Sequence, residues 1–307
     1  MDAFITKNIV RSGLWLGFVI LAGVTVVSVV ISNVAAAADQ AENSITMSPS
    51  STTLAVDAGE VASGSMKVIN EGDTPYEFNV YARPYGVTNE QYDPDFTTQN
   101  TNANVYKWVQ FDQTKYRIEP GQSTEITYTI HVPTDAAPGG HYGVLFAETG
   151  ANEVASTGVA RKNRVGNLLY VTVNGSHIEK GRLKEFVLPS WQASAPMISS
   201  VRLQNTGNVD FRAKVTTTAK DMFGRTKYTY TGDPIVLPET TRLAEMKWES
   251  APNFGIFKVD QSVEFLNQKQ QNSSFVLIAP KWALIVVILV IVAGAAYVIL
   301  RRRGNRP

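Results

Sequence analysis

The sequence predicts an all-β protein of two tandem immunoglobulin-like β-sandwiches, with an N-terminal signal helix and a C-terminal single transmembrane helix. Three observations predict this architecture: two uncharged apolar runs near the ends of the 307-residue chain, apolar and polar residues alternating between them, and an internal repeat of strand and turn motifs. The length allows about two ordinary domains. A hydrophobic fraction of 44% excludes a disordered chain.

The first apolar run, residues 14–31, carries no charge. Lys7 and Arg11 precede it, and four alanines, residues 35–38, follow it just before Asp39. A basic segment, an apolar segment and small residues in this order are typical of a secretory signal. We therefore predict a signal peptide over residues 1–38. The run is also long enough to remain as an uncleaved anchor, and this alternative stays open.

The second apolar run, residues 283–300, predicts a transmembrane helix, because 18 helical residues span about 27 Å. Trp282 and Arg301, Arg302 and Arg303 flank it as membrane-interface anchors. The positive-inside rule places the basic tail, residues 301–307, and the basic N-terminus in the cytoplasm. We therefore predict a single-pass cell-membrane protein that contacts the lipid bilayer through this helix and has its ectodomain outside.

Charge and cysteine content limit the partners. Seven of the 28 basic residues lie at the two ends, so the stretch from Asp39 to Pro280 carries 21 bases and 26 acids, a net charge of −5. A mildly acidic ectodomain does not indicate nucleic-acid binding. Exported β-rich proteins often contain disulfides, but this chain has no cysteine. That composition favours a bacterial surface protein over an animal receptor ectodomain.

Alternating patterns predict the strands. In residues 124–132, Ile126, Tyr128, Ile130 and Val132 fall on one face and polar residues on the other. Turn signals rich in Gly, Pro and Asn separate such runs. Short strands separated by such turn signals predict β-sandwiches.

The pattern then repeats along the chain. Residues 201–208 resemble residues 66–73, each a strand that ends in Asn-x-Gly, and residues 236–239 echo residues 118–121. We therefore predict one sandwich over residues 44–178 and a second over 179–268. The first sandwich carries extra length at Gly86 to Val105. Residues 269–282, which begin polar, are predicted to be a stalk.

One segment nearly matches a sortase signal: Leu237-Pro238-Glu239-Thr240-Thr241. Its fifth residue is Thr241, where the transpeptidase motif has glycine, and it lies 42 residues before Ala283. We therefore predict a strand followed by a turn, equivalent to residues 118–121, and a protein that stays in the membrane.

Motifs of catalysis are missing from the sequence. The three histidines, His131, His141 and His177, have no paired metal-ligand spacing. The sequence contains no G-x-S-x-G elbow, P-loop or H-E-x-x-H motif. We predict a protein that is not an enzyme and needs neither a cofactor nor a metal.

A set of short motifs recurs along the first domain: Gly59, Ser63–Asn70, Trp108–Val109, Ile118–Ser123, Val132–Gly143 and Leu168–Gly175. With these motifs the first domain resembles the WxL-interacting-protein peptidoglycan-binding domain family of bacterial surfaces. The order of signal peptide, two sandwiches, one span and a basic tail is also similar, whereas the second domain is closer to a generic immunoglobulin-like module. Membership would imply binding of the cell wall or of a surface partner without catalysis.

Aromatic and basic residues of the first domain are the candidate ligand contacts. Exposed rings stack on sugars and anchor protein interfaces, and loops on a rigid sandwich are common binding sites. Core packing is the alternative for the rings, and a solvated strand entrance is the alternative for the bases. We expect the partner to be cell-wall glycan or a wall-associated surface protein. A structural or adaptor subunit of a membrane complex or surface filament, binding protein through sheet edges, is the alternative function. The candidate contacts are Tyr85, Tyr92, Phe96, Arg161, Lys162 and Arg164.

Overall fold

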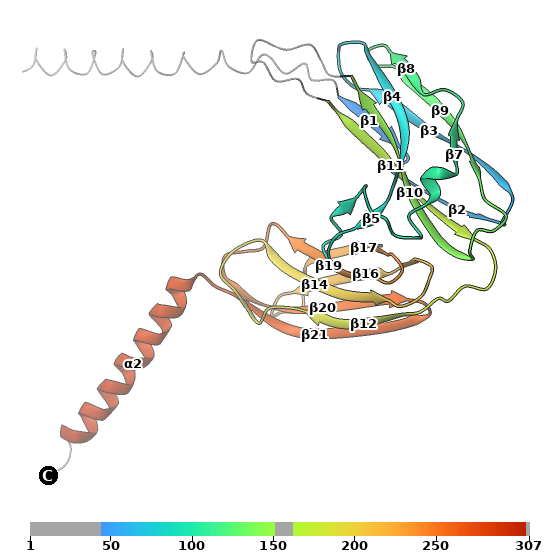
Figure 1. Cartoon of the computed structure of the whole chain (residues 1–307). Helices are drawn as coiled ribbons and strands as arrows, with labels where there is room; N and C mark the ends of the chain where they lie inside the picture. Colours follow the sequence, from blue (N-terminus) through green and yellow to red (C-terminus); the bar gives the residue numbers. More distant parts are fainter. Residues whose placement is uncertain (1–43, 151–161, 305–307) are drawn as a thin grey trace, which may run out of the picture.

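The computed structural model describes residues 44–150 and 162–304, so the predicted signal peptide lies outside the described residues. Within them the chain forms two β-sandwiches in series and one long C-terminal helix (Figure 1). The prediction of an all-β fold with two tandem immunoglobulin-like sandwiches is confirmed.

The first sandwich packs a four-stranded sheet on a five-stranded sheet. The pairs within both sheets are antiparallel except β2 with β11, which is parallel. In order across the first sheet the strands are β1 (Ile45–Ser48), β3 (Val61–Asn70), β9 (Ser123–His131) and β7 (Val109–Phe111). In order across the second they are β2 (Ser51–Val56), β11 (Arg164–Val173), β10 (Gly139–Thr149), β4 (Tyr76–Pro84) and β8 (Lys115–Ile118).

The core of the first sandwich follows the alternation in the sequence. Ile126, Tyr128 and Ile130 of β9 are fully buried, whereas Glu125 and His131 are exposed. Their side chains join Phe78, Leu145 and others in one apolar cluster. Full burial of each such side chain stabilises the fold by about 1.5–3 kcal/mol. Because the apolar residues alternate with polar ones, this gain determines which face of β9 points into the core.

Between β4 and β7 the chain leaves the sandwich. This insertion contains the two-residue strands β5 (Gly86–Val87) and β6 (Pro94–Asp95), which pair with each other, and the short 3-10 helix η2 (Val105–Lys107). The insertion points toward the second sandwich (Figure 1). Trp108, which follows η2, is buried in the core of the first sandwich.

The second sandwich packs a three-stranded sheet on a five-stranded sheet, with a separate two-stranded pair at one end. In order, the three-stranded sheet contains β12 (Gly181–Val187), β14 (Met197–Asn205) and β19 (Thr241–Trp248). The five-stranded sheet contains β13 (Trp191–Gln192), β21 (Gln268–Ile278), β20 (Gly255–Phe265), β16 (Lys214–Lys220) and β17 (Thr226–Gly232). The separate pair is β15 (Phe211–Arg212) with β18 (Ile235–Val236).

Equivalent asparagines confirm the internal repeat. Asn70 ends β3, and its side chain bonds the carbonyl of Thr74 and the amide of Gly72. Asn205 ends β14 and bonds the carbonyl of Val209 and the amide of Gly207 in the same way. Both asparagines have no exposed surface. Each therefore closes the Asn-x-Gly turn that the repeated motif predicts.

The predicted stalk over residues 269–282 is wrong. Residues Gln268–Ile278 form β21, which pairs with β20 along its whole length. Leu266 and Asn267 both have positive φ and connect the two strands in two residues, the geometry of a type I′ hairpin. The polar residues at the start of β21 face solvent, which gives the segment the composition of a linker. Its backbone is nevertheless fully paired with β20.

The last element is the helix α2 (Lys281–Gly304), which extends away from the second sandwich (Figure 1). Its stretch Lys281–Ile299 has a mean hydropathy of 2.8, and none of it is buried in the protein. By length and composition it can cross a membrane. The predicted tail ends outside the described residues, at 305–307.

Candidate functional site

The two sandwiches meet through an apolar cluster on the outer face of the first one. Tyr85, Tyr142 and Tyr170 of the first domain pack there with Ile235 and Leu237 of the second. Leu237 begins the segment that resembles a sortase signal, and Ile235 lies in β18 just before it. The segment follows β18 and forms a turn that leads into β19, so a strand is followed by a turn as predicted. Its Glu239 has positive φ like Gly121 in the first domain.

Tyr92 of the insertion holds this turn. Its hydroxyl accepts a hydrogen bond from the Leu237 amide at 2.8 Å and lies 2.5 Å from Thr240 Oγ1. The Arg242 guanidinium lies 4.3 Å from the centre of the Tyr92 ring. Burial raises the pKa of Tyr92, so its hydroxyl stays protonated at neutral pH. The backbone of Tyr92 has φ of 68°, an uncommon conformation for a bulky residue.

Glu90 makes a second attachment beside Tyr92. Its main-chain carbonyl accepts a hydrogen bond from the Leu243 amide at 2.7 Å, which ties the insertion to β19. Its carboxylate lies 2.8 Å from Arg202 Nε on β14. The ion pair is partly exposed, so it contributes at most about 1 kcal/mol, and the main-chain bond adds a similar amount.

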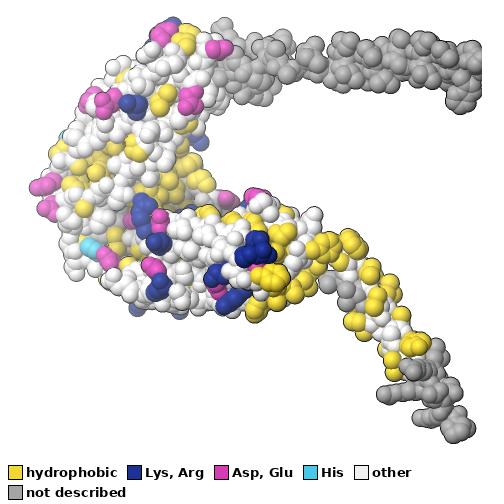
Figure 2. Space-filling model, turned by 180° about the vertical axis from the view of Figure 1, so that it is seen from behind, with side chains coloured by type: hydrophobic (Ala, Val, Ile, Leu, Met, Phe, Trp, Pro, Cys, Tyr) yellow, Lys and Arg dark blue, Asp and Glu magenta, His cyan; other side chains and the backbone are white. Residues whose placement is uncertain are grey.

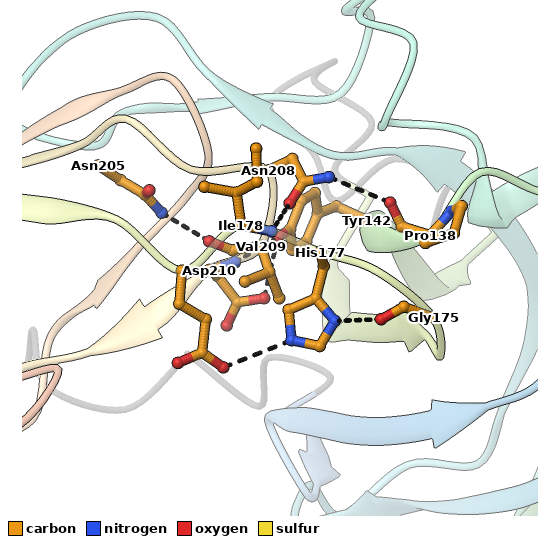
Figure 3. Close-up of polar contacts among 10 residues, drawn as sticks. Pro138, Tyr142, Gly175, His177, Ile178, Asn205, Asn208, Val209 and Asp210 are labelled. Carbon is orange, nitrogen blue, oxygen red and sulfur yellow. Dashed lines mark hydrogen bonds and ion pairs between the residues drawn. The ribbon is translucent and has the colours of Figure 1, made fainter.

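The segment between the domains is fixed by Asn208 (Figure 3). Its side chain accepts a hydrogen bond from the Ile178 amide at 2.7 Å and donates to the Pro138 carbonyl at 3.2 Å. Its main-chain carbonyl accepts from the Gly140 amide at 2.9 Å. One side chain therefore joins the first domain, the connecting segment and the second domain.

Tyr142 and Asp210 form a buried polar contact between the domains (Figure 3). The Tyr142 hydroxyl donates to Asp210 Oδ1 at 2.9 Å and accepts from the Asp210 amide at 3.0 Å. Burial raises the pKa of the Asp210 carboxyl. Burial, followed by the nearby Asp210 charge, also raises the pKa of Tyr142. The contact therefore serves as a structural hydrogen bond at neutral pH.

A polar groove of about 880 Å³ runs beside this junction. Seven of its seventeen lining residues carry side-chain amides or hydroxyls, and they alternate with Pro, Ala and Trp side chains. Asp135 and Glu239 are the charged residues among those that line it. Lys and Arg do not occur among these lining residues. The first domain contributes Gln99, Asn100, Thr101, Asn102, Asn104, Trp108, Pro133, Asp135, Ala136, Ala137, Pro138, Gly140 and His141, and the second contributes Asn208, Pro238, Glu239 and Thr240.

His141 belongs to the wall of the groove and is only 6% exposed. Its Nε2 lies 2.8 Å from the Ala137 carbonyl and its Nδ1 lies 2.8 Å from Asn104 Oδ1. Its ring packs on Trp108 with centres 4.8 Å apart. Burial lowers the pKa of His141, so the ring is neutral at pH 7. Because the ring is buried with each nitrogen beside a protein oxygen, His141 acts as a structural support of the groove.

Of the aromatic candidate contacts, Tyr85 is buried, and Tyr92 and Phe96 are half-buried. Tyr85 is 6% exposed and packs edge-on against Tyr170. Phe96 packs edge-on against Phe146 with ring centres 4.9 Å apart. With Tyr92 held by the 237–240 turn, these rings pack at the junction. The burial of Tyr85 corrects the expectation that its ring is open to a ligand, whereas ligand contact by Tyr92 and Phe96 stays a prediction. The cluster combines the outer face of the first sandwich, at Tyr170 and Phe146, with Ile235 and Leu237 of the second domain.

The basic candidate contacts have separate positions. Arg161 lies outside the described residues. Lys162 Nζ lies 3.4 Å from Glu148 Oε1. The Arg164 guanidinium lies 4.3 Å from the centre of the Phe146 ring. Arg164 therefore extends the ring cluster, and ligand contact by Lys162 and Arg164 stays a prediction.

Sequence reasoning missed the groove itself. The polar, uncharged run Gln99–Asn104 forms part of one wall, and this run is the local signal that could have indicated it. The opposite wall comes from residues more than 100 positions later, which only the domain arrangement brings close. In the part of the chain that the structure describes, no group of three or more His, Cys, Asp or Glu residues could hold a metal ion.

Comparisons with known proteins give similarity at the level of fold. No protein-family model matches the chain, and no curated protein matches it. Among solved structures, the class 5 fimbriae chaperone CfaA has a TM-score of 0.39 at 12% identity, with 76% of this chain and 99% of that chain covered. The Escherichia coli chaperone DraB has a TM-score of 0.36 at 10% identity, with 76% and 98% covered. A structure of the Salmonella enterica SafA pilin with the SafB chaperone has a TM-score of 0.39 at 10% identity, with 78% and 98% covered. At these TM-scores the similarity carries no functional argument.

Proposed function

We propose that the protein is a single-pass cell-surface binding protein whose groove between the two sandwiches holds an uncharged polar polymer, such as a cell-wall glycan. The groove lining is the observation that carries this proposal. Amide and hydroxyl side chains recognise sugar hydroxyls by hydrogen bonds, and a cluster of bases would be needed to hold an anionic polymer. The proposal includes a place in the WxL-interacting family, which the residues quoted above suggest.

Rigid walls support binding in this groove. Asn208, Tyr142 and Tyr92 tie the domains together on one side of it, so its two walls keep their spacing without a ligand. A preformed site loses little conformational freedom on binding. Gln99, Asn100 and Thr101 are exposed in the wall, where their side chains can exchange water for ligand hydroxyls, although Gln99 Nε2 also donates to the Thr97 carbonyl at 3.3 Å.

Co-sedimentation of the purified full chain with peptidoglycan tests the glycan proposal. Replacing Gln99, Asn100 and Thr101 by Ala together removes up to three ligand hydrogen bonds of about 1 kcal/mol each, so we expect binding to weaken roughly a hundredfold. A matched control replaces Lys184, Thr229 and Thr231, which are exposed on the second sandwich, and should bind normally. Binding that falls steeply with salt, or equal binding by both triple variants, would contradict the proposal.

A second function rests on one edge of the second sandwich. In the described residues, β13 pairs with β21 only at Leu277 and Ile278, so Gln268–Val276 of β21 form an edge with main-chain groups available for another strand. Strand addition to such an edge would make the protein a structural or adaptor subunit. A photo-crosslinker at Gln270 should then capture one stoichiometric protein partner, and a crosslinker at the exposed Lys258 of β20, which is paired on both sides, should not. Equal capture at both positions would count against this function.

A further inference from the structure

The end of the second sandwich that leads into α2 carries an apolar, aromatic surface. Met222 and Phe223 in the β16–β17 loop are 65% and 83% exposed. Phe254, which directly precedes β20, and Ile256, near the start of β20, are also exposed. Figure 2 shows hydrophobic side chains gathered at this end of the sandwich, next to a group of Lys and Arg side chains. We call these four residues the membrane-proximal tip.

The strand registers place the four tip residues at one end of the sandwich. Lys220 at the end of β16 pairs with Lys258 of β20, and Ile256 pairs with Leu277 of β21. The β16–β17 loop and the start of β20 therefore lie beside the end of β21. The first sandwich lies at the opposite end, where it contacts the 237–240 turn.

The connection from this end to α2 is short and fixed. Two residues, Ala279 and Pro280, separate the end of β21 from the start of the helix, and two residues reach at most about 7 Å. The Ala279 amide donates to the Gln192 carbonyl at 2.9 Å, and its carbonyl accepts from Trp191 Nε1 at 3.0 Å. The helix therefore cannot move far from the tip.

Contact between aromatic rings joins the tip to the helix directly. The Phe254 ring packs edge-on against Trp282 of α2, with centres 5.7 Å apart. Trp and Tyr at this position of a membrane helix lie at the headgroup level. If Trp282 lies there, Phe254 lies at the same level.

Basic residues beside the apolar tip match a lipid headgroup region. The Arg225 guanidinium lies 5.1 Å from the centre of the Phe223 ring, and Lys227 follows on β17. Arg225 and Lys227 both lie near the carboxylate of Asp221, so two positive charges face one negative charge in this loop. The exposed Glu249 carboxylate in the neighbouring loop reduces this positive charge. Aromatic rings that enter the interface, with long bases reaching to headgroups, are the pattern of interfacial membrane contact.

We propose that the membrane-proximal tip docks on the outer surface of the bilayer that α2 crosses, with the Phe223 ring inserted at the headgroup level. This inference rests on the proposed function only in its membrane anchoring. Docking would hold the second sandwich against the bilayer at two places, the helix and the tip, and would fix the direction in which the groove faces.

Spin labels on single cysteines test the docking, since the natural chain has no cysteine. The full chain is reconstituted in vesicles of phosphatidylcholine with phosphatidylglycerol, carrying Phe223→Cys, Ile291→Cys or Thr231→Cys. Collision rates with oxygen, which concentrates in lipid, and with a water-soluble nickel chelate are measured at each site. We expect the oxygen-to-nickel ratio at 223 to approach that at 291 and to exceed that at 231, the matched control at the other end of the same hairpin.

The outcomes separate the two proposals. A lipid-like ratio at 291 with a water-like ratio at 223 would overturn docking and leave the membrane anchor intact. Low collision rates with both reagents at 223 would mean that protein, such as a second copy of the chain, covers the tip, which also overturns docking. A ratio at 291 that is not lipid-like would overturn the anchor itself. A second variant combines Phe223→Asp with a spin label at Phe254→Cys. We expect this change to lower the oxygen-to-nickel ratio at 254 toward the value of a site in water.

Discussion

Single asparagines at the ends of equivalent strands fix the turns of both domains. Asn205 also donates to the Val236 carbonyl, at 2.9 Å, in addition to its bonds inside the turn. It therefore links the end of β14 to the strand that leads into the interdomain turn. A buried amide with three partners is costly to replace, because each partner is left without a hydrogen bond in a site that excludes water.

The change Asn205→Ala should destabilise the second domain by about 3–5 kcal/mol, since the Gly207 amide and two carbonyls lose their partner. Chemical unfolding of the full chain in detergent measures this loss. Lys184→Ala, at an exposed position of β12, serves as the control and should change stability by less than about 0.5 kcal/mol. A loss of less than about 1 kcal/mol for Asn205→Ala would contradict the role given to this residue.

His141 gives the first domain a pH-dependent stability. Burial holds its folded pKa below the ordinary value of about 6.5, so the unfolded chain binds the proton more readily. Stability is therefore complete above about pH 6.5 and falls as the pH drops toward the folded pKa. We expect the difference in unfolding free energy between the natural chain and His141→Gln to shrink over this range. A difference that stays constant from pH 8 to pH 5 would contradict the prediction.

At the scale of elements, the insertion between β4 and β7 acts as a strap between the domains. Its hairpin bonds β19 through Glu90 and the 237–240 turn through Tyr92, and its Phe96 packs back on Phe146 of β10, in the five-stranded sheet of the first sandwich. The extra length of the first domain is therefore explained by the contacts that the insertion makes with the second domain. The second domain needs no equivalent insertion. The strap also places Gln99–Asn104 in the wall of the groove.

Loss of the Tyr92 ring should loosen the two sandwiches. Tyr92→Ala removes two hydrogen bonds, the contact with Arg242 and a buried ring, together about 3 kcal/mol. Spin labels at Asp73→Cys and Lys184→Cys, one on each domain, should then show a broader distance distribution than in the parent chain. Tyr92→Phe keeps the ring and should broaden it less. An unchanged distribution in Tyr92→Ala would show that the strap does not hold the domains.

Elements with one apolar face could be predicted from the sequence, and others could not. β9 was predictable because Ile126, Tyr128 and Ile130 alternate with polar residues. β21 was missed because its first seven residues, Gln268 to Ser274, are polar on both faces, and because the I′ turn at Leu266 and Asn267 lacks the usual glycine. The rings of Tyr85 and Phe96 were expected in an open loop, since a local pattern does not show the cluster on the outer face of the first sandwich against which they pack.

At the scale of the whole molecule, the second sandwich separates the groove from the helix. The groove lies at the end of that sandwich which meets the first domain, and α2 leaves from the other end (Figure 1). With the helix in a membrane, the groove would face material above the bilayer surface. A ligand in the surrounding wall could then reach it without contact with lipid.

This arrangement requires the two ends of α2 to lie on opposite sides of the membrane, with the sandwiches outside. The basic residues after the apolar stretch favour the cytoplasmic side for the C-terminus. Single thiols test this in intact cells with a membrane-impermeant maleimide: Lys184→Cys in the second sandwich should be labelled, whereas a cysteine appended after Pro307 should react only after the membrane is permeabilised. The natural chain, which has no cysteine, provides the background. Labelling of the appended cysteine in sealed cells, or protection of position 184, would reverse the orientation and remove the groove from the cell surface.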